Sequence, residues 1–282
     1  MTVLTRLLSF VIGSVFSISL CSYAPDAIGQ SINLGVLTDL TGVYSALSGE
    51  GSAEAARMAV EDFGGKVLGK EIRVLVADHH RKVDTATKIA TDWFDNDEVG
   101  VLLDLANSTI ALAGQKLAAD RGKISITVTA ATADLTGKQC RETGFHWAWD
   151  TYSNSINLAP TMVGFGLNTW FFITVDYALG WSAEQMASNA VTAAGGRVLG
   201  SIRHPLNTRD FGPFVTAALD SNAKVIALAS AGEDTIDTIR QAAEIGVSSR
   251  SQTLAPLAVS ISDVHALGLD TAKGMVFIEN FY

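Results

Sequence analysis

Mostly apolar runs alternate with amphipathic stretches along the chain. In the first half, the apolar runs cover residues 32–38, 71–78, 99–106 and 123–130. The stretches between them repeat apolar positions with the helical period of about 3.6 residues and cover 51–65, 83–97 and 109–122. Gly64 and Gly65 mark the end of the first stretch. The pattern predicts four strands that alternate with three helices.

The alternation restarts after the short segment 147–155. Helices are predicted at 156–166, 182–196, 210–223 and 234–247. Strands are predicted at 169–176, 197–206, 224–230, 251–259 and 274–281. Strands separated by helices form parallel sheets with helices on both faces. The chain is therefore predicted to be an α/β protein with two doubly wound parallel-sheet lobes, and segment 147–155 is the crossover and hinge between them.

The first residues have the pattern of an export signal. Arg6 precedes the apolar run 7–20, and Ala27 and Gly29 have the spacing that a signal peptidase requires. The run is shorter than the roughly 20 apolar residues of a spanning helix, and Leu20 before Cys21 argues against a lipoprotein signal. We therefore predict a signal peptide over 1–29, a first lobe over 30–150 and a second lobe over 151–282. We expect a periplasmic protein that is not inserted in a membrane after cleavage.

Composition narrows the class of protein. The 282 residues are 48% hydrophobic and 17% charged, which is typical of a folded globular chain. The formal net charge of −9 argues against a nucleic-acid partner, which needs a basic surface. After signal removal, Cys140 remains from the two cysteines. We expect either a partner outside this chain or a free, buried thiol.

Glycines near the first helix match part of a dinucleotide-binding fingerprint. Gly49 and Gly51 precede this helix, and Asp78 ends the next strand. In that fingerprint the glycines follow the strand directly, whereas here about ten residues intervene and Glu54 replaces the third glycine. A dinucleotide-dependent enzyme is therefore only an alternative from another class, and no cofactor is predicted.

The histidines and Cys140 predict neither a metal site nor a catalytic site. His79 and His80 are adjacent, so their side chains point apart, and we expect two solvated loop histidines. There is no G-x-S-x-G elbow, and nothing pairs Cys140 with His146 as a nucleophile and base. We expect His146 to be a hydrogen-bonded structural residue, and the chain not to be an enzyme.

Two loops at strand ends are rich in small hydroxyl side chains. Residues 107–109 follow the third strand and open a helix, and residues 129–136 follow the fourth strand. Backbone N–H groups at a helix N-terminus, together with such hydroxyls, can hold a carboxylate without a basic residue. The alternative is ordinary N-capping by Asn107, Ser108 or Thr132. The residues alone leave both readings open.

The chain resembles the periplasmic substrate-binding proteins of ABC transporters in the branched-chain amino acid (Leu/Ile/Val-binding) family. The similarity rests on the order and spacing of "GVLTDLTGVYSALSGEGSAEAARMAVEDF", "DLANSTIALA", "ITVTAATADLTGKQC", "DYALGWSAEQM", "RDFGPFVTAAL" and "ALASAGEDTIDTIRQAAEIG". It implies a type I periplasmic-binding fold whose lobes close on a ligand in the cleft between them. It also implies that the closed form docks on an ABC permease.

The resemblance further implies a set of ligand-binding residues. The first lobe is expected to hold the ligand carboxylate through Ser108, Ala131 and Thr132, with Asn107 in the same loop as Ser108. The rest of the ligand is expected to contact Tyr44, Leu47, Tyr152, Leu179 and Ala231. Leu179 and Ala231 are smaller than the family's usual contacts, which leaves more room in the pocket.

The expected ligand class depends on whether an acidic residue is present at one position of the second lobe. The amino-acid binders of the family have one after the strand near 251–259, but residues 256–261 contain none, and Asp263 lies out of register. A buried ammonium group without a carboxylate partner is unfavourable. We therefore expect an aromatic or other bulky carboxylate to bind more tightly than leucine. A branched-chain amino acid-like ligand, and a ligand-sensing module of the same fold, remain as alternatives.

The resemblance also implies a longer chain, because the relatives return to the first lobe after the position of Tyr282. We therefore expect a C-terminally truncated chain whose segment 30–282 is poorly soluble by itself. A late cysteine of the relatives would be the partner of Cys140.

Overall fold

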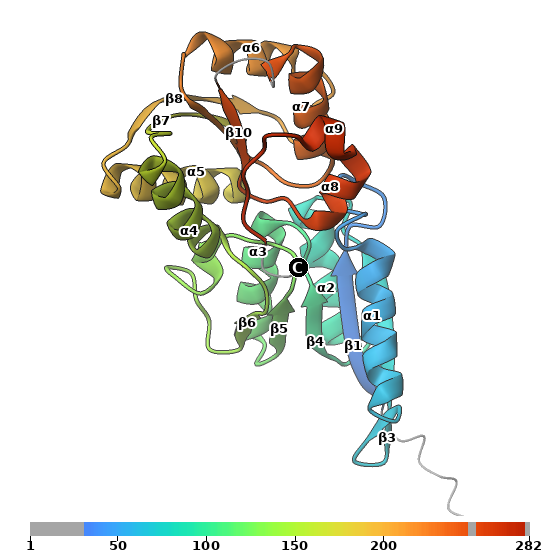
Figure 1. The fold of residues 1–282 in the computed structure, drawn as a ribbon. Helices are drawn as coiled ribbons and strands as arrows, with labels where there is room; N and C mark the ends of the chain where they lie inside the picture. Colours follow the sequence, from blue (N-terminus) through green and yellow to red (C-terminus); the bar gives the residue numbers. More distant parts are fainter. Residues whose placement is uncertain (1–30, 248–251, 280–282) are drawn as a thin grey trace, which may run out of the picture.

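The computed structural model describes residues 31–247 and 252–279. The predicted signal peptide therefore lies outside the described residues, as do the first residue of the strand predicted at 251–259 and the end of the one predicted at 274–281. Figure 1 shows two α/β units that lie one above the other. We call residues 31–150 the first lobe and residues 151–279 the second lobe.

The first lobe is built on one sheet with the strand order β2-β3-β1-β4-β5-β6. Its strands are β1 (Ile32–Thr38), β2 (Lys66–Val67), β3 (Lys70–Asp78), β4 (Val99–Asp104), β5 (Ile124–Thr127) and β6 (Gly144–His146). All neighbours are parallel except β2, which forms an antiparallel hairpin with β3. Strands β2 and β6 were not predicted, because strands of two or three residues are too short to show a period.

Three helices and a 3₁₀ turn pack on this sheet. They are α1 (Gly49–Asp62), α2 (Val83–Asp95), α3 (Ser108–Asp120) and η1 (Ala133–Leu135). The apolar faces of α2 and α3 meet strand side chains in a continuous core that includes Trp93, Leu102 and Ile110. This core supports the loops at the carboxyl ends of β1, β4 and β5.

The second lobe has a parallel sheet with the order β10-β9-β7-β8. Its strands are β7 (Thr169–Val175), β8 (Arg197–His204), β9 (Val225–Ala229) and β10 (Thr253–Pro256). Its helices are α4 (Thr151–Gly164), α5 (Ala178–Ala193), α6 (Gly212–Asp220), α7 (Glu233–Glu244), α8 (Ile261–Leu267) and α9 (Leu269–Ala272). Helices on both faces cover β9, whose five residues are all buried, as expected for a central parallel strand. The predicted fold class is therefore confirmed.

The crossover is shorter than the predicted segment 147–155. Helix α4 begins at Thr151, because Asp150 and Ser153 form a reciprocal capping box in which Asp150 Oδ1 accepts the Ser153 N–H at 2.7 Å. Only residues 147–150 link the last first-lobe strand to this helix. Tyr152 consequently lies in the first turn of a helix and not in a linker.

The predictions for the end of the chain and for Cys140 need correction. Among the described residues, 274–279 form no strand, although the Val276 N–H donates to the Leu254 carbonyl at 3.1 Å. Helix α8 was not predicted. Cys140 is exposed, not buried, and forms no disulfide within the described part of the chain. No helix in 31–247 or 252–279 is long and apolar enough to cross a bilayer.

Candidate ligand-binding site

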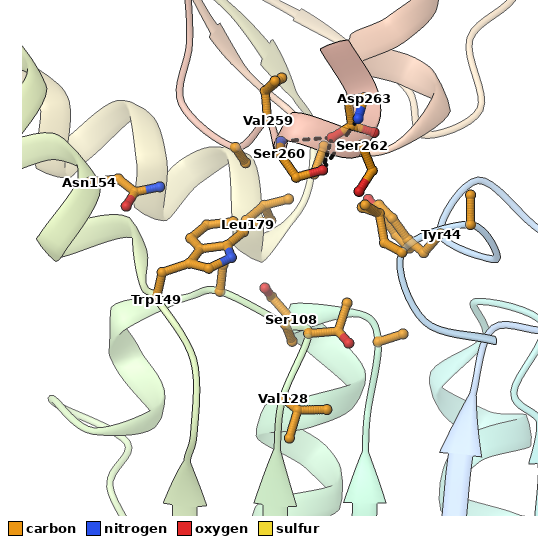
Figure 2. A pocket seen from close by; sticks show the side chains of 18 of the residues that line it. Tyr44, Ser108, Val128, Trp149, Asn154, Leu179, Val259, Ser260, Ser262 and Asp263 are labelled. Carbon is orange, nitrogen blue, oxygen red and sulfur yellow. Dashed lines mark hydrogen bonds between the residues drawn. The ribbon is translucent and has the colours of Figure 1, made fainter. Parts of the chain in front are cut away.

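A cavity of about 270 Å³ lies between the two lobes. Its walls come from the loops that follow β1, β4, β5, β7, β9 and β10, with Trp149 of the crossover at one side (Figure 2). The carboxyl ends of parallel strands in open sheets are the usual place for a ligand site. Here the ends of two such sheets face each other across one space.

The wall from β4 begins with a capped helix. Asn107 Oδ1 accepts the N–H groups of Thr109 at 3.0 Å and Ile110 at 3.2 Å, so Asn107 is the N-cap of α3. Ser108 follows at the first helical position, lines the cavity and is nearly fully buried. Its Oγ accepts the Thr132 N–H at 3.3 Å. The Ser108 hydroxyl proton therefore remains available to a ligand oxygen.

The wall from β5 consists of residues 128–131. Ala131 lies on the cavity, whereas Thr132 is fully buried behind it, and its Oγ1 accepts the Asp134 N–H at 3.4 Å. His146 Nε2 bonds to the Ala130 carbonyl at 2.7 Å, which confirms the structural role expected for this histidine. The capping alternative thus describes Asn107 and Thr132, whose side chains are not part of the cavity wall.

Tyr152 does not reach the cavity, contrary to the prediction. Its side chain is 52% exposed, and it lines a separate surface depression with Met186. Because α4 begins at Thr151, the residues that its buried face brings to the cavity are different. Asn154 lines the cavity and donates through Nδ2 to the Leu257 carbonyl at 3.0 Å. Trp149, just before the helix, is the aromatic residue of the crossover that lines the cavity (Figure 2).

Four of the other predicted positions line the cavity as well. Tyr44 and Leu47 come from the loop after β1, Leu179 from the first turn of α5, and Ala231 from the loop after β9. The small Ala231 and aliphatic Leu179 leave this part of the wall smooth and apolar. At Leu179 and Ala231 the second-lobe wall therefore offers apolar contact to a ligand and no side-chain hydrogen bond.

Asp263 also lines the cavity, contrary to the expectation that it lies out of register. It is the third residue of α8 and forms a capping box with Ser260, whose N–H and Oγ donate to Asp263 Oδ2 at 2.8 and 2.9 Å. Glu279 borders the same cavity. The pattern S-x-x-D before an apolar run was the signal that could have predicted α8 and this carboxylate.

The chain matches the family model of periplasmic binding proteins over residues 31–282. It belongs to this family. A periplasmic binding protein from Burkholderia mallei is 41% identical, with a TM-score of 0.87 over 90% of this chain and 67% of that one. A branched chain amino acid ABC transporter periplasmic ligand-binding protein from Burkholderia xenovorans LB400 is 34% identical, with a TM-score of 0.71 over 87% of this chain and 66% of that one.

A curated relative is also similar. The Leu/Ile/Val-binding protein homolog 6 of Brucella melitensis is 26% identical over 267 residues, which are 93% of this chain. The chain spans 66% of the length of this relative. The resemblance stated from the sequence and the type I periplasmic-binding fold are both confirmed.

In this periplasmic binding protein, two tyrosines close one side of the cavity. Tyr44 from the first lobe and Tyr177 from the second lobe share a hydrogen bond between their hydroxyl groups at 2.5 Å. Burial raises the pKa of both hydroxyls, and each also experiences the nearby acidic side chains Asp234 and Asp39. Both hydroxyls are therefore protonated at neutral pH, and the bond joins two neutral groups.

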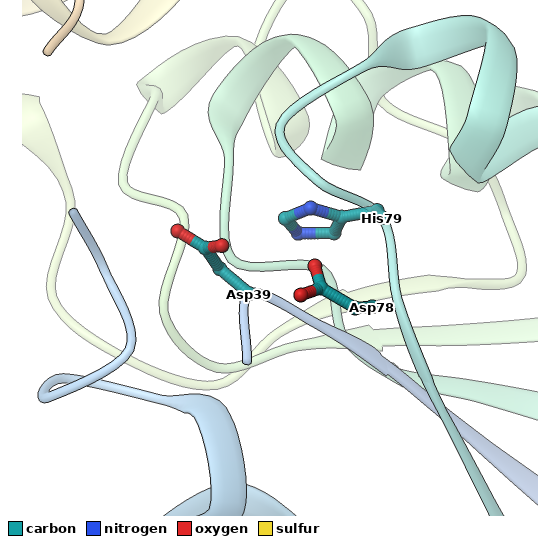
Figure 3. A group of neighbouring side chains, drawn as sticks. All are labelled: Asp39, Asp78 and His79. Atoms are coloured by element: carbon teal, nitrogen blue, oxygen red, sulfur yellow. The ribbon is translucent and has the colours of Figure 1, made fainter. Parts of the chain in front are cut away.

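A group of ionisable side chains lies at the ends of β1 and β3 (Figure 3). Potential ligand atoms of Asp39, Asp78 and His79 lie within 4.8 Å of one another. His79 is fully buried, so the expectation of two solvated histidines is wrong for it and holds only for the exposed His80. The β3–α2 loop is joined to the end of β1 by the His79 N–H, which donates to the Thr38 carbonyl at 3.0 Å.

This group is a poor set of metal ligands. His79 Nδ1 accepts the Arg81 N–H at 3.0 Å, so the proton of the neutral ring is assigned to Nε2, and a metal needs an unprotonated nitrogen. Burial lowers the pKa of His79 to about 4, so the ring is neutral at neutral pH. The Arg81 guanidinium, 2.7 Å from Asp39 Oδ1, already supplies the positive charge that the carboxylates need. The group is better described as a buried ion-pair cluster.

Proposed function

We propose that this chain is the solute-binding component of an ABC importer, which captures a small carboxylate between its lobes in the periplasm and delivers it to a membrane permease. Family membership supports the role, and the Ser108 hydroxyl on the cavity wall carries the proposal of a carboxylate. The related solved structures are substrate-binding proteins, and we propose that this chain likewise binds its ligand without a chemical reaction.

The carboxylate fits the first-lobe wall for two physical reasons. Ser108 is the first residue of α3, and the positive end of a helix dipole favours an anion. The Ser108 oxygen is already occupied as an acceptor by the Thr132 N–H, so its proton points to a different partner. An anion at this wall therefore gains a hydrogen bond without displacing one that the fold uses.

Two ligand classes fit the rest of the cavity. The aromatic side chains of Tyr44 and Trp149 and the small Ala231 on the cavity wall favour an aromatic or bulky carboxylate. Asp263 favours a ligand that also carries an ammonium group, as a branched-chain amino acid does. Both Ser260 bonds go to Asp263 Oδ2, so Oδ1 keeps its capacity to accept a hydrogen bond. The argument against an ammonium group from the lack of a nearby acid therefore no longer holds.

The test of the proposal is a calorimetric titration with benzoate-type acids and with leucine. Charge-assisted hydrogen bonds contribute roughly 1.5–3 kcal/mol. Ser108→Ala is therefore expected to lower the affinity for the ligand that binds the wild type more tightly by about tenfold or more. Thr109→Ala is the matched control, because Thr109 is the next residue of the same helical turn but is not part of the cavity wall. Equal affinity of the wild type and Ser108→Ala, with the fold intact, would refute the carboxylate assignment.

A further inference from the structure

We propose that closure of the lobes is controlled by a latch that extends beyond the ligand-contact surface. The latch segment consists of Val43 and Tyr44 of the first lobe. It packs against Gly232 and Glu233 of the second lobe. The buried Asp39, paired with Arg81, holds the latch segment in position. The inference rests on the proposed function in that it concerns the same cleft. It differs from that function because it assigns closure to residues that include Val43, Gly232, Glu233 and Asp39, none of which lines the cavity.

The latch joins the lobes by direct protein contacts. The Glu233 N–H donates to the Val43 carbonyl at 3.1 Å, and the hydroxyl groups of Tyr44 and Tyr177 form a second hydrogen bond between the lobes. Val43 and Tyr44 are buried together with Leu179 and Ala231 in one apolar cluster that spans the cleft. These contacts are made between protein groups alone, so they stabilise a closed form by themselves.

Gly232 allows the two backbones to approach this closely. Its φ of 64° and ψ of −145° belong to a region that is essentially restricted to glycine. A Cβ at this position would lie 2.3 Å from the Val43 carbonyl oxygen and 3.0 Å from Tyr44 Cδ1. A side chain here would therefore push against the backbone of the other lobe, which cannot move aside without opening the cleft.

Asp39 fixes the position of the latch segment on the first lobe. Its Oδ2 accepts the Tyr44 N–H at 3.1 Å, and its Oδ1 accepts from Arg81 Nη1 at 2.7 Å. Asp39 is fully buried, and Arg81 packs so closely that a Cβ on Gly42 would lie 1.5 Å from Arg81 Nη1. Asp39, drawn in Figure 3, thus links Arg81 of the loop after β3 to Tyr44 of the latch segment. Asp39 is a positioning residue for closure.

The test measures closure without any ligand. Small-angle X-ray scattering of the full chain is expected to give a larger radius of gyration for Gly232→Ala than for the wild type. Hydrogen exchange is expected to be about tenfold faster or more at the Glu233 amide in this variant. Gly195→Ala is the control, since Gly195 also has a positive φ of 84° but nothing lies within 4 Å of its Cβ position. The control is expected to leave both measurements unchanged.

Two further variants keep the test decisive if Gly232→Ala does not fold. Tyr177→Phe removes only the hydroxyl pair, and Asp39→Asn weakens the support of the latch segment. Both are expected to increase exchange at the Glu233 amide, and Asp39→Asn also at the Tyr44 amide. Wild-type scattering that already matches an open form, or unchanged exchange in all folded variants, would overturn the latch. Because neither measurement uses a ligand, failure of the latch is distinct from failure of carboxylate binding.

Discussion

On the first-lobe wall of the cavity, Ser108 offers a hydroxyl at the beginning of α3, whereas on the second-lobe wall Asp263 offers a carboxylate in the first turn of α8. Both residues lie at a helix N-terminus, but they have opposite preferences for a ligand. Ser108 favours an anion, and Asp263 favours a hydrogen-bond donor or a cation. A ligand with both groups would be oriented by this difference, and a simple acid would use only one wall.

The two walls also differ in their support. Helix α3 has 13 residues and packs in the first-lobe core through fully buried Ile110, whereas α8 has seven residues and packs through Val264, which is 8% exposed. Ile110→Ala is expected to lower the free energy of unfolding by roughly 2–5 kcal/mol, because it leaves a cavity in a close-packed core. Val264→Ala removes fewer carbon atoms and is expected to cost clearly less. Denaturant unfolding of both variants measures the difference, and equal losses would show that the walls are supported alike.

Removal of the Asp263 charge separates the two ligand classes. Asp263→Asn is expected to weaken the binding of leucine by roughly 1.5–3 kcal/mol, or about tenfold to a hundredfold, because the ammonium group of leucine loses a charged partner. The same substitution is expected to leave the affinity for benzoate-type acids unchanged or to increase it, because it removes a negative charge that repels the ligand carboxylate. Calorimetry on both ligands distinguishes these outcomes. If neither ligand responds, Asp263 only caps α8, and the proposed contrast between the walls is wrong.

The two buried acids Asp39 and Asp234 have different partners, and the surroundings of Asp234 make the stability of the protein depend on pH. Asp39 of the first lobe is paired with Arg81 at 2.7 Å, whereas Asp234 at the start of α7 accepts the Asn207 N–H at 3.0 Å and has His204 at 3.9 Å. Burial raises the pKa of Asp234 to about 7. The folded state therefore holds a proton that the unfolded state releases near pH 4, so stability falls as pH rises from about 4 to about 7.

Asp234→Asn tests this pH dependence. The variant is expected to remove the contribution of Asp234 to the slope and to be more stable than the wild type at pH 8 by on the order of 1 kcal/mol. Thermal unfolding between pH 4 and pH 8 measures both quantities. A wild type whose stability rises throughout this range, with the same profile in Asp234→Asn, would contradict the raised pKa.

The smallest effect is expected at Tyr152. Because this side chain is 52% exposed and lies outside the cavity, Tyr152→Ala is expected to change the affinity for the tighter ligand by less than about twofold. Trp149→Ala, three residues earlier, removes an aromatic wall and is expected to weaken the same ligand clearly. The reverse order of these two effects would mean that the crossover presents Tyr152, as the sequence suggested.

The parts of the site that the sequence predicted depend on short-range patterns. The sequence could place Ser108 on the cavity wall because it lies shortly after an apolar strand and starts a helix. Tyr152 was misplaced because the start of α4 depends on a capping box at Asp150, and a shift of five residues changes which side chains face the cleft. His79 was misjudged because its burial depends on Asp39 and Arg81, and no local pattern records a contact between distant loops.

The position of Trp149 makes the intrinsic fluorescence of the protein sensitive to the contents of the cavity. Its indole forms part of the wall, whereas the indoles of Trp93 and Trp170 are buried in the two cores and away from it. The emission of an indole depends on the polarity of its surroundings, and a ligand in the cavity replaces water beside Trp149. Occupancy of the cleft is therefore expected to change the intrinsic fluorescence of the unlabelled protein, so that the molecule reports its own ligand.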